Sequence, residues 1–274
     1  MLLKMKVILN NTQLKKIIKL NQNIGFVPTM GSLHKGHISL IKESKKKTKK
    51  TLVSIFVNPR QFNDKKDFIN YPRNIKKDKS ILKNLKVDFL YLPSTKEIFP
   101  KSSKLIKKIN KKNKILCAKF RKGHFEGVLN VMDRLTYLIN PKNIFMGEKD
   151  YQQFYVVKKY LEKKYKTNVI LCKTIRDKNG LALSSRNKLL KKSEILKAQK
   201  ISKNLKKIKS NIKRISNIKK ELENKKKELE EKFSIQIQYL ELRNKTNLDL
   251  SIKKQNSKLF VAYYLNNIRL IDNF

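Results

Sequence analysis

The stretch Val27-Pro28-Thr29-Met30-Gly31-Ser32-Leu33-His34-Lys35-Gly36-His37 follows a short apolar run that begins at Ile24. An apolar, β-branched run predicts a buried strand, and the apolar spacing that starts at His37 predicts a helix. We therefore expect a strand-to-helix junction. Two glycines let the backbone approach a ligand closely, and a helix start offers free N–H groups to phosphate.

Two of the three histidines of the chain, His34 and His37, lie in this junction. They are three residues apart, so they fall on one helix face and can donate to one polyphosphate together. Ring nitrogens that cap the turn, or half of a metal site, are the alternatives. A metal site would need further His, Cys or carboxylate ligands, and the junction offers none. We expect phosphate binding, because H-x-G-H at such a junction is a specific pattern.

Strand and helix patterns continue to alternate along the chain. Strands are expected at 24–27, 51–57, 87–92, 143–146 and 168–171, and helices at 37–50, 125–139 and 149–164. This alternation predicts an α/β fold with a Rossmann-like, doubly wound parallel sheet. Ligands of such sheets bind at the carboxyl ends of strands, so we expect a site in the loops after Val27, Val57, Met146 and Leu171.

A second, smaller α+β domain is expected at the C-terminus, which gives domains of 1–186 and 187–274. Residues 193–232 are helical by pattern, and their apolar residues are spaced by three and four from Ala198 to Ile215. This is the rhythm of a coiled coil, but the register holds for only two or three heptads. An amphipathic helix pair is favoured, packed on strands at 235–242 and 258–264.

The chain is strongly basic. It has 274 residues and a formal charge of +46, from 67 Lys plus Arg against 21 Asp plus Glu. Such a charge suggests that the protein binds nucleic acid or an anionic membrane. However, the excess is mostly Lys spread over the whole length, together with many Asn and Ile, which a biased genome explains equally well. We expect no specific nucleic-acid partner; a basic nucleic-acid-binding protein with a vestigial site is the alternative.

The cysteines and the apolar runs indicate the compartment. Cys117 and Cys172 fit no C-x-x-C pattern, so we expect two buried thiols in a reducing compartment. No apolar run approaches 18 residues, and the first ten residues have Lys inside their apolar stretch and no cleavage site. We expect a cytoplasmic protein without a membrane segment.

Six blocks of sequence, in order, resemble the pantoate-β-alanine ligase family of the HxGH nucleotidyltransferase superfamily. They span residues 25 to 273 and are VPTMGSLHKGH (27–37), SIFVNPRQF (54–62) followed by Tyr71-Pro72-Arg73, RKGHFEGV (121–128), FMGEKDYQQ (145–153), IRD with GLALSSRN (175–187), and RLIDN (269–273). The chain departs from the family at Lys122, where Pro is usual, and in the stretch 264–267, where Gly is usual. Asn tolerates left-handed backbone conformations, so the second departure costs little.

The resemblance implies an ATP-dependent ligase that condenses (R)-pantoate with β-alanine to give pantothenate, AMP and diphosphate through a pantoyl adenylate. It implies ATP as a substrate, Mg²⁺ with the ATP, and a homodimer. A related HxGH nucleotidyltransferase that acts on another acid is the alternative enzyme. The larger domain is expected to bind nucleotide and pantoate, and the smaller one to act as a lid.

The resemblance also assigns roles to individual residues. Catalytic roles are implied for His34, His37, Lys149, Ser184, Ser185 and Arg186. Contacts to ATP are implied for Met30, Gly31, Ser32, Leu33, His34, Lys35, Gly36, His37, Gly147, Glu148, Lys149, Asp150, Ile175, Leu183, Ser184, Ser185 and Arg186. Contacts to pantoate or β-alanine are implied for Pro28, Met30, Asn58, Gln61, Tyr71, Arg121, His124 and Gln153. Asp78 is the nearest plausible carboxylate for Mg²⁺.

Several of these residues have ordinary structural explanations. Lys149-Asp150 alone is typical of a solvated helix start, and Ser184-Ser185-Arg186 alone is typical of a helix N-cap. Met30 and Ile175 are ordinary core residue types, and His124 is suited to a structural hydrogen bond. By resemblance, we expect residues 184–186 to form a flexible loop that closes over the departing phosphates.

Overall fold

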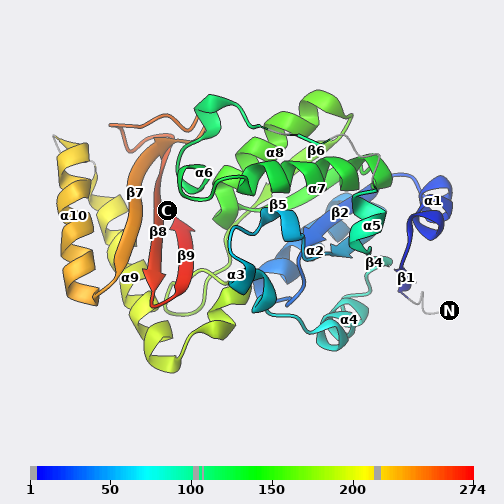
Figure 1. Ribbon diagram of the computed structural model, residues 1–274, viewed down its shortest axis with the longest axis horizontal. Helices are drawn as coiled ribbons and strands as arrows, with labels where there is room; N and C mark the ends of the chain where they lie inside the picture. Colours follow the sequence, from blue (N-terminus) through cyan, green and yellow to red (C-terminus); the bar gives the residue numbers. More distant parts are fainter. Residues whose placement is uncertain (1–4, 101–104, 107, 213–216) are drawn as a thin grey trace. The chain divides into compact units, whose positions relative to one another are not determined.

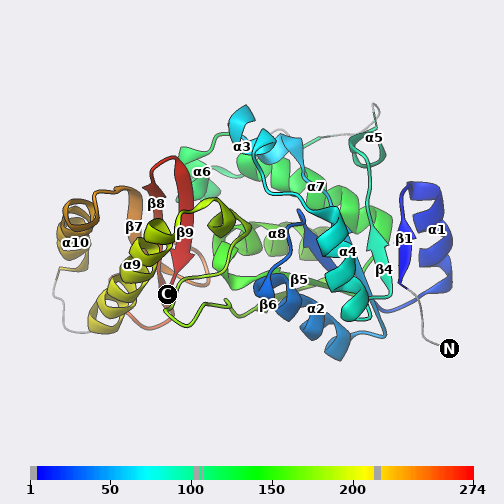
Figure 2. The ribbon, with the colours of Figure 1, turned by 90° about the horizontal axis from the view of Figure 1, so that it is seen from below.

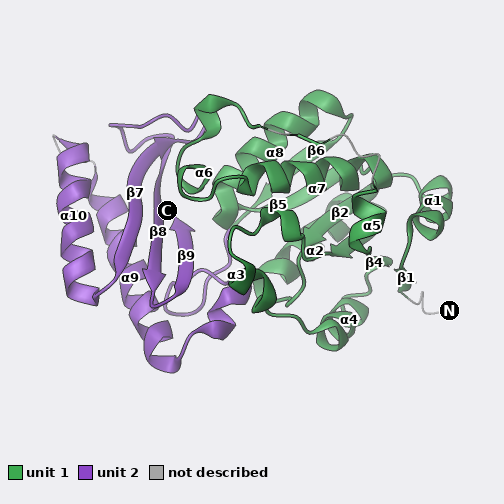
Figure 3. Cartoon of the chain, viewed as in Figure 1, with its two compact units in different colours: residues 1–173 green, residues 174–274 purple. Residues whose placement is uncertain are grey.

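The computed structural model describes residues 5–100, 105–106, 108–212 and 217–274. The chain divides into two compact units, Met1–Lys173 and Thr174–Phe274, which we call unit 1 and unit 2 (Figure 3). This division falls 13 residues before the expected boundary after residue 186. Arg176 forms a β-bridge with Ala182 and pairs with Asp272 near the end of unit 2, so this segment folds with unit 2.

Unit 1 is built on a six-stranded parallel sheet with the strand order β1-β4-β3-β2-β5-β6 (Figure 1). The strands are β1 (Lys6–Ile8), β2 (Ile24–Thr29), β3 (Lys50–Ile55), β4 (Phe89–Tyr91), β5 (Asn143–Gly147) and β6 (Asn168–Cys172). The five expected strands and the doubly wound sheet are confirmed; β1 was not predicted. The chain reverses its direction across the sheet at β2, which lies between β3 and β5, and this switch point is where such sheets bind ligands.

Helices cover both faces of this sheet. The helices of unit 1 are α1 (Asn11–Leu20), α2 (Lys35–Lys47), α3 (Lys65–Ile69), α4 (Ile75–Asn84), α5 (Thr95–Ile98), α6 (Cys117–Phe120), α7 (His124–Ile139) and α8 (Tyr151–Lys164), with 3₁₀ turns η1 (Pro59–Gln61), η2 (Lys111–Asn113) and η3 (Glu148–Asp150). Helices α2 and α4 lie on one face, and α7 and α8 lie on the other (Figure 2). Val27 packs with Ile41 and Leu82 of the first pair. Burial on both faces explains why the central strands read as continuous apolar runs.

Unit 2 packs two helices on an antiparallel sheet. The elements are η4 (Ser185–Leu189), α9 (Lys192–Asn211), α10 (Ile218–Phe233), β7 (Gln236–Asn244), β8 (Ser257–Leu265) and β9 (Ile268–Asn273), and the strands follow the order β7-β8-β9. Ala198, Ile201 and Leu205 are buried in one cluster with the sheet, which confirms the amphipathic helix pair. Ile215 lies outside the described residues. Asn266, in the stretch where the family usually has Gly, has φ +49° between β8 and β9.

The two cysteines are free and buried, as expected from their isolated positions. Burial raises the pKa of the Cys172 thiol to about 11, which suppresses the reactive thiolate at neutral pH. Among the residues that the structure describes, no helix is both long enough and apolar enough to cross a membrane.

Gly127 lets α7 lie directly against the chain that follows β3. A Cβ atom at this position would come within 2.2 Å of the Arg60 carbonyl oxygen and 2.9 Å of the Gln61 Cα. The carbonyl of Gly127 also accepts a hydrogen bond from Asn58 Nδ2, at 3.1 Å. This close approach fixes the backbone that carries Gln61.

Gly127→Ala is expected to destabilise the protein by about 1–3 kcal/mol, because the added methyl group must displace backbone rather than a flexible side chain. The free energy of unfolding in urea measures the effect. Gly147→Ala is the matched control for stability, since no atom lies within 4 Å of a Cβ built there. Equal stability of the two variants would contradict the close packing of α7 on η1.

Candidate active site

The turn between β2 and α2 is held in an unusual backbone conformation. Gly31 has φ +79° and Ser32 has φ +53°, so two consecutive residues lie in the left-handed region. Ser32 carries a side chain, so its conformation costs free energy unless the surroundings enforce it. The enforcement comes from hydrogen bonds: Gly31 N donates to Thr29 Oγ1 at 3.1 Å, and Ser32 N and Leu33 N donate to the carboxylate of Asp78 at 2.8 Å each.

Asp78, in the first turn of α4, is therefore an anchor for this turn. Its two oxygens accept from two different backbone N–H groups, and the residue is only 2% exposed. A carboxylate used in this way does not fit the Mg²⁺ role predicted for it, which needs oxygens that face the metal. Within the described ranges, no group of three or more His, Cys, Asp or Glu side chains is arranged to hold a metal.

The two histidines cap α2 with their own ring nitrogens. His34 Nδ1 accepts from Gly36 N at 3.1 Å, and His37 Nδ1 accepts from His34 N at 3.4 Å. The ring centroids are 4.1 Å apart. Since each Nδ1 is an acceptor, the proton of each neutral ring is carried by Nε2, which becomes a hydrogen-bond donor. The two rings therefore cap the start of α2, which is the capping alternative. The same hydrogen bonds leave each neutral ring in the tautomer whose Nε2–H can donate to an anion.

Gly36 is required by this arrangement. A Cβ atom at residue 36 would lie 2.8 Å from Cε1 and 2.9 Å from Nδ1 of His34. Any side chain there would push the His34 ring out of its capping position. The glycine of the H-x-G-H pattern therefore has a steric explanation in this chain.

A second cluster lies around η1 and the start of α7. Gln61 Nε2 is 3.0 Å from Met30 Sδ, and Gln61 Oε1 accepts from Asn58 Nδ2 at 3.1 Å. Asn58 is buried and also accepts from Arg60 N through Oδ1, so it caps η1. Three residues predicted to contact pantoate or β-alanine, Met30, Asn58 and Gln61, are therefore brought together.

His124 and Arg121 join this cluster through the backbone of Gln61. The Gln61 carbonyl accepts from His124 Nδ1 at 2.7 Å and from Arg121 Nη2 at 3.2 Å. A carbonyl can only accept, so the ring proton of neutral His124 lies on Nδ1, and its Nε2 accepts from Arg121 Nη1 at 3.1 Å. Both ring nitrogens of His124 thus serve protein contacts, which supports the structural interpretation of this residue.

The end of β5 presents charged and polar groups. Lys149 lies in η3, with its side chain 17% exposed and its Nζ 3.9 Å from Asp150 Oδ1. In the first turn of α8, Gln152 is buried. Its Oε1 accepts from Cys117 N at the start of α6, and its Nε2 donates to Ile115 O just before that helix. Gln153 is half-buried and makes none of these contacts.

The remaining residues of unit 1 that were predicted to bind substrate are part of the sheet, the helices or the core. Leu33 is buried between β2 and α2, and Tyr71 is buried with its ring 5.6 Å from the ring of Phe62. The others belong to the elements already named: Pro28 to β2, Lys35 to α2, Gly147 to β5 and Glu148 to η3.

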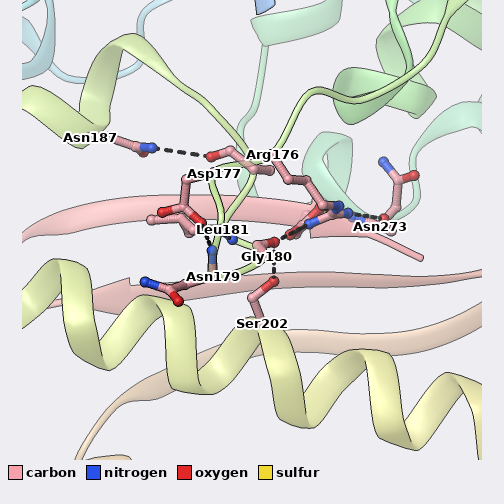
Figure 4. Close-up of polar contacts among 10 residues, drawn as sticks. Arg176, Asp177, Asn179, Gly180, Leu181, Asn187, Ser202 and Asn273 are labelled. Atoms are coloured by element: carbon pink, nitrogen blue, oxygen red, sulfur yellow. Dashed lines mark hydrogen bonds and ion pairs between the residues drawn. The ribbon is translucent and has the colours of Figure 1, made fainter.

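In unit 2, residues 184–186 form a hydrogen-bonded turn at the start of η4. Ser184 Oγ accepts from Arg186 N at 3.3 Å and so caps η4. Ser185 is buried. Asn187 Nδ2 donates to Ala182 O at 3.1 Å and fixes the turn from the other side (Figure 4). The N-cap interpretation is correct for Ser184, and hydrogen bonds from Arg186 N and Asn187 Nδ2 hold the turn.

Two supporting residues were not identified from the sequence. Thr29 anchors Gly31 and bonds to Ser54 O through its hydroxyl, at 2.8 Å. Asp272 pairs with Arg176, 96 residues earlier in the chain. Thr29 and Asp272 both occur in blocks that resemble the family, and the block itself was the signal available for each.

A doubly wound parallel sheet with an H-x-G-H helix start at its switch point defines a nucleotide-binding α/β protein. The family described as pantoate-beta-alanine ligase matches residues 5–274 of the chain. This chain belongs to the pantoate-β-alanine ligase family, whose members are called pantothenate synthetases.

Individual relatives agree with this family. A pantothenate synthetase of Sulfurihydrogenibium sp. is 39% identical over 98% of this chain and 99% of its own length, and one of Francisella tularensis subsp. mediasiatica is 42% identical over 92% and 89%. The crystal structure of a Thermus thermophilus pantothenate synthetase matches with a TM-score of 0.91 and 29% identity, over 98% of this chain and 99% of that one. A Francisella tularensis pantoate-β-alanine ligase, complexed with β-γ ATP and β-alanine, matches with a TM-score of 0.83 and 38% identity, over 98% and 97%.

Asp78→Asn is expected to lower the free energy of unfolding by about 1–3 kcal/mol, because the amide NH₂ group faces a backbone N–H that had a carboxylate oxygen as its partner. Urea unfolding measures the loss. Asp64→Asn is the matched control, since exposed Asp64 caps α3 and Asn is an equally good N-cap. Unchanged stability combined with a greatly raised Mg²⁺ requirement would contradict the anchoring role and restore the metal role.

Proposed function

We propose that this chain joins pantoate to β-alanine in two steps, through a pantoyl adenylate. Its membership of the family makes it an ATP-dependent carbon-nitrogen ligase. The observation that carries the two-step proposal is the H-x-G-H helix start, where two imidazole Nε2–H donors and the amino end of α2 meet at the switch point of the sheet. This arrangement suits the stabilisation of negative charge on phosphate oxygens.

In the first step, a carboxylate oxygen of pantoate attacks the α-phosphorus of ATP, and the bond to diphosphate breaks. In the second step, the amine of β-alanine attacks the acyl carbon, the amide forms, and AMP leaves. Neither step needs a nucleophile from the protein. The chain has to supply fixed donors where charge develops and to keep the adenylate away from water.

The ATP side is assigned to the H-x-G-H turn and the end of β5. His34 and His37 donate to phosphate oxygens through Nε2, and Lys149 supplies a point charge. Ser184, Ser185 and Arg186 supply further donors to the departing diphosphate. The fixed backbone of both segments supports these roles, because donors held in place before the reaction need no reorganisation during it.

The pantoate side is assigned to the cluster around η1. Gln61 and Gln153 have amides that both donate and accept, which suits a carboxylate and two hydroxyls. Met30 and Pro28 form an apolar wall for the geminal methyl groups. Asn58, Tyr71 and Arg121 lie toward the β-alanine side. His124 contributes through the backbone of Gln61, since both of its nitrogens already have partners.

The cofactor, the compartment and the assembly complete the proposal. Mg²⁺ would enter with ATP, and Asp78 would not hold it, because its two oxygens bond to Ser32 N and Leu33 N. A cytoplasmic location is supported by the use of ATP and by two free thiols. A homodimer is supported by the resemblance to the family, and sedimentation equilibrium tests it.

Exchange of labelled diphosphate into ATP is expected when pantoate is present and β-alanine is absent, because the first step is reversible and complete without the amine. The purified protein is incubated with ATP, labelled diphosphate and each acid in turn. β-Alanine is expected not to replace pantoate. A folded, ATP-binding protein that shows no pantoate-dependent exchange would rule out the adenylate route.

His34→Asn is expected to slow this exchange by about 10²-fold while leaving stability near that of the wild type. The Asn side-chain oxygen can accept from Gly36 N as His34 Nδ1 does, and Asn is a good N-cap, but the Nε2 donor is lost. Exchange kinetics and urea unfolding are measured together, with His34→Ala removing both contributions. Wild-type exchange in His34→Asn would show that the ring serves only as a cap.

A further inference from the structure

Arg176 is the centre of a hydrogen-bond network in unit 2 (Figure 4). Its Nη1 donates to Asp272 Oδ2 at 2.7 Å and its Nη2 donates to Asp272 Oδ1 at 2.8 Å, so the pair is bidentate. The same two nitrogens donate to Gly180 O and Asn273 O, each at 2.9 Å. Such a fork fixes both the position and the orientation of the guanidinium group.

The partner of Arg176 is itself rigidly placed. Asp272 lies in β9, is 6% exposed, and accepts a further hydrogen bond from Asn273 N at 2.7 Å through Oδ1. Phe274 exchanges two backbone hydrogen bonds with Leu259 of β8, each 3.0 Å long, and its ring lies 4.4 Å from the guanidinium carbon of Arg176. The network is therefore attached to the sheet of unit 2.

Helix α9 holds the same segment from its other side. Ser202 Oγ donates to Gly180 O at 2.7 Å, and Gln199 Nε2 donates to Asp177 Oδ2 at 2.7 Å. Asp177 Oδ1 accepts from Asn179 N and Leu181 N at 2.9 Å each, which closes the tip of the hairpin. The hairpin is thus fixed to a helix and to a strand.

The stem of this hairpin leads directly into residues 184–186. Arg176 and Ala182 form its β-bridge, and Leu183 N donates to Ile175 O at 3.0 Å. The next residue is Ser184, the cap of η4. A rotation of the stem would therefore move the backbone that carries Ser185 and Arg186.

We propose that Arg176 and Asp272 are positioning residues for adenylate formation, which hold the hairpin stem so that Arg186 is presented in one fixed place. This inference rests on the role proposed above for residues 184–186. A bidentate pair suits the task, because small displacements of catalytic donors have large kinetic effects. Lys in place of Arg176 cannot reproduce the fork.

The test is a double-variant cycle on pantoate-dependent diphosphate exchange. Asp272→Asn is expected to lower kcat for exchange by about 10-fold or more, with the KM for pantoate near that of the wild type. Arg176→Lys is expected to give a loss of similar size. Asp249→Asn, an exposed residue of unit 2 outside the network, is expected to change nothing.

The decisive measurement is Asp272→Asn in an Arg186→Ala background. If the pair acts through Arg186, the second substitution lowers the remaining exchange by less than about 2-fold, since its target is gone. Circular dichroism and urea unfolding check that each variant is folded. If Asp272→Asn does not fold, Phe274→Leu replaces it in the cycle, because this change removes the ring over Arg176 and keeps an apolar side chain.

The outcomes separate the inference from the function on which it rests. Losses that multiply independently in the double variant overturn the positioning role and leave the pair with a structural role only. Wild-type exchange in Asp272→Asn also overturns it. Wild-type exchange in Arg186→Ala contradicts the role proposed for Arg186 itself, whatever Asp272→Asn does.

Discussion

The buried carboxylate of Asp78 accepts hydrogen bonds from Ser32 N and Leu33 N, and the turn between β2 and α2 depends on this contact. This contact helps to offset the free-energy cost of the left-handed backbone at Ser32. The turn sets where α2 begins, and therefore where the imidazole rings of His34 and His37 lie. A carboxylate buried in this way is stabilised by the backbone dipoles that it organises.

The imidazole rings that cap α2 are the same rings to which the proposed function assigns the phosphate contacts. The Nδ1 atoms of His34 and His37 satisfy backbone N–H groups at the start of α2, and this use determines that Nε2 carries the proton. Around η1 the roles of the two ring nitrogens are exchanged. His124 donates through Nδ1 to the Gln61 carbonyl, which holds that backbone, and accepts through Nε2. His34 and His37 thus share one tautomer and His124 adopts the other, because different backbone groups face them.

The sequence was sufficient for the parallel sheet, the helix pair and the H-x-G-H junction, because each follows from local periodicity or from residues close together in the chain. It was insufficient where a side chain bonds to a distant backbone. Asp78 was the nearest plausible carboxylate for Mg²⁺ in the sequence, and the backbone groups that it binds lie 45 and 46 residues away. The same limit applies to the segment before residue 187, since Arg176 joins unit 2 through its pair with Asp272.

The pairing of Arg176 with Asp272 also has a consequence for how the chain folds during synthesis. Every strand of the parallel sheet, and all the contacts of the H-x-G-H turn described above, involve residues before 174, so they are complete once that length has emerged. The hairpin that leads to Ser185 cannot be locked until β9 has been made, 96 residues after Arg176. Folding from the amino end therefore produces the nucleotide-binding sheet first and the locked hairpin last.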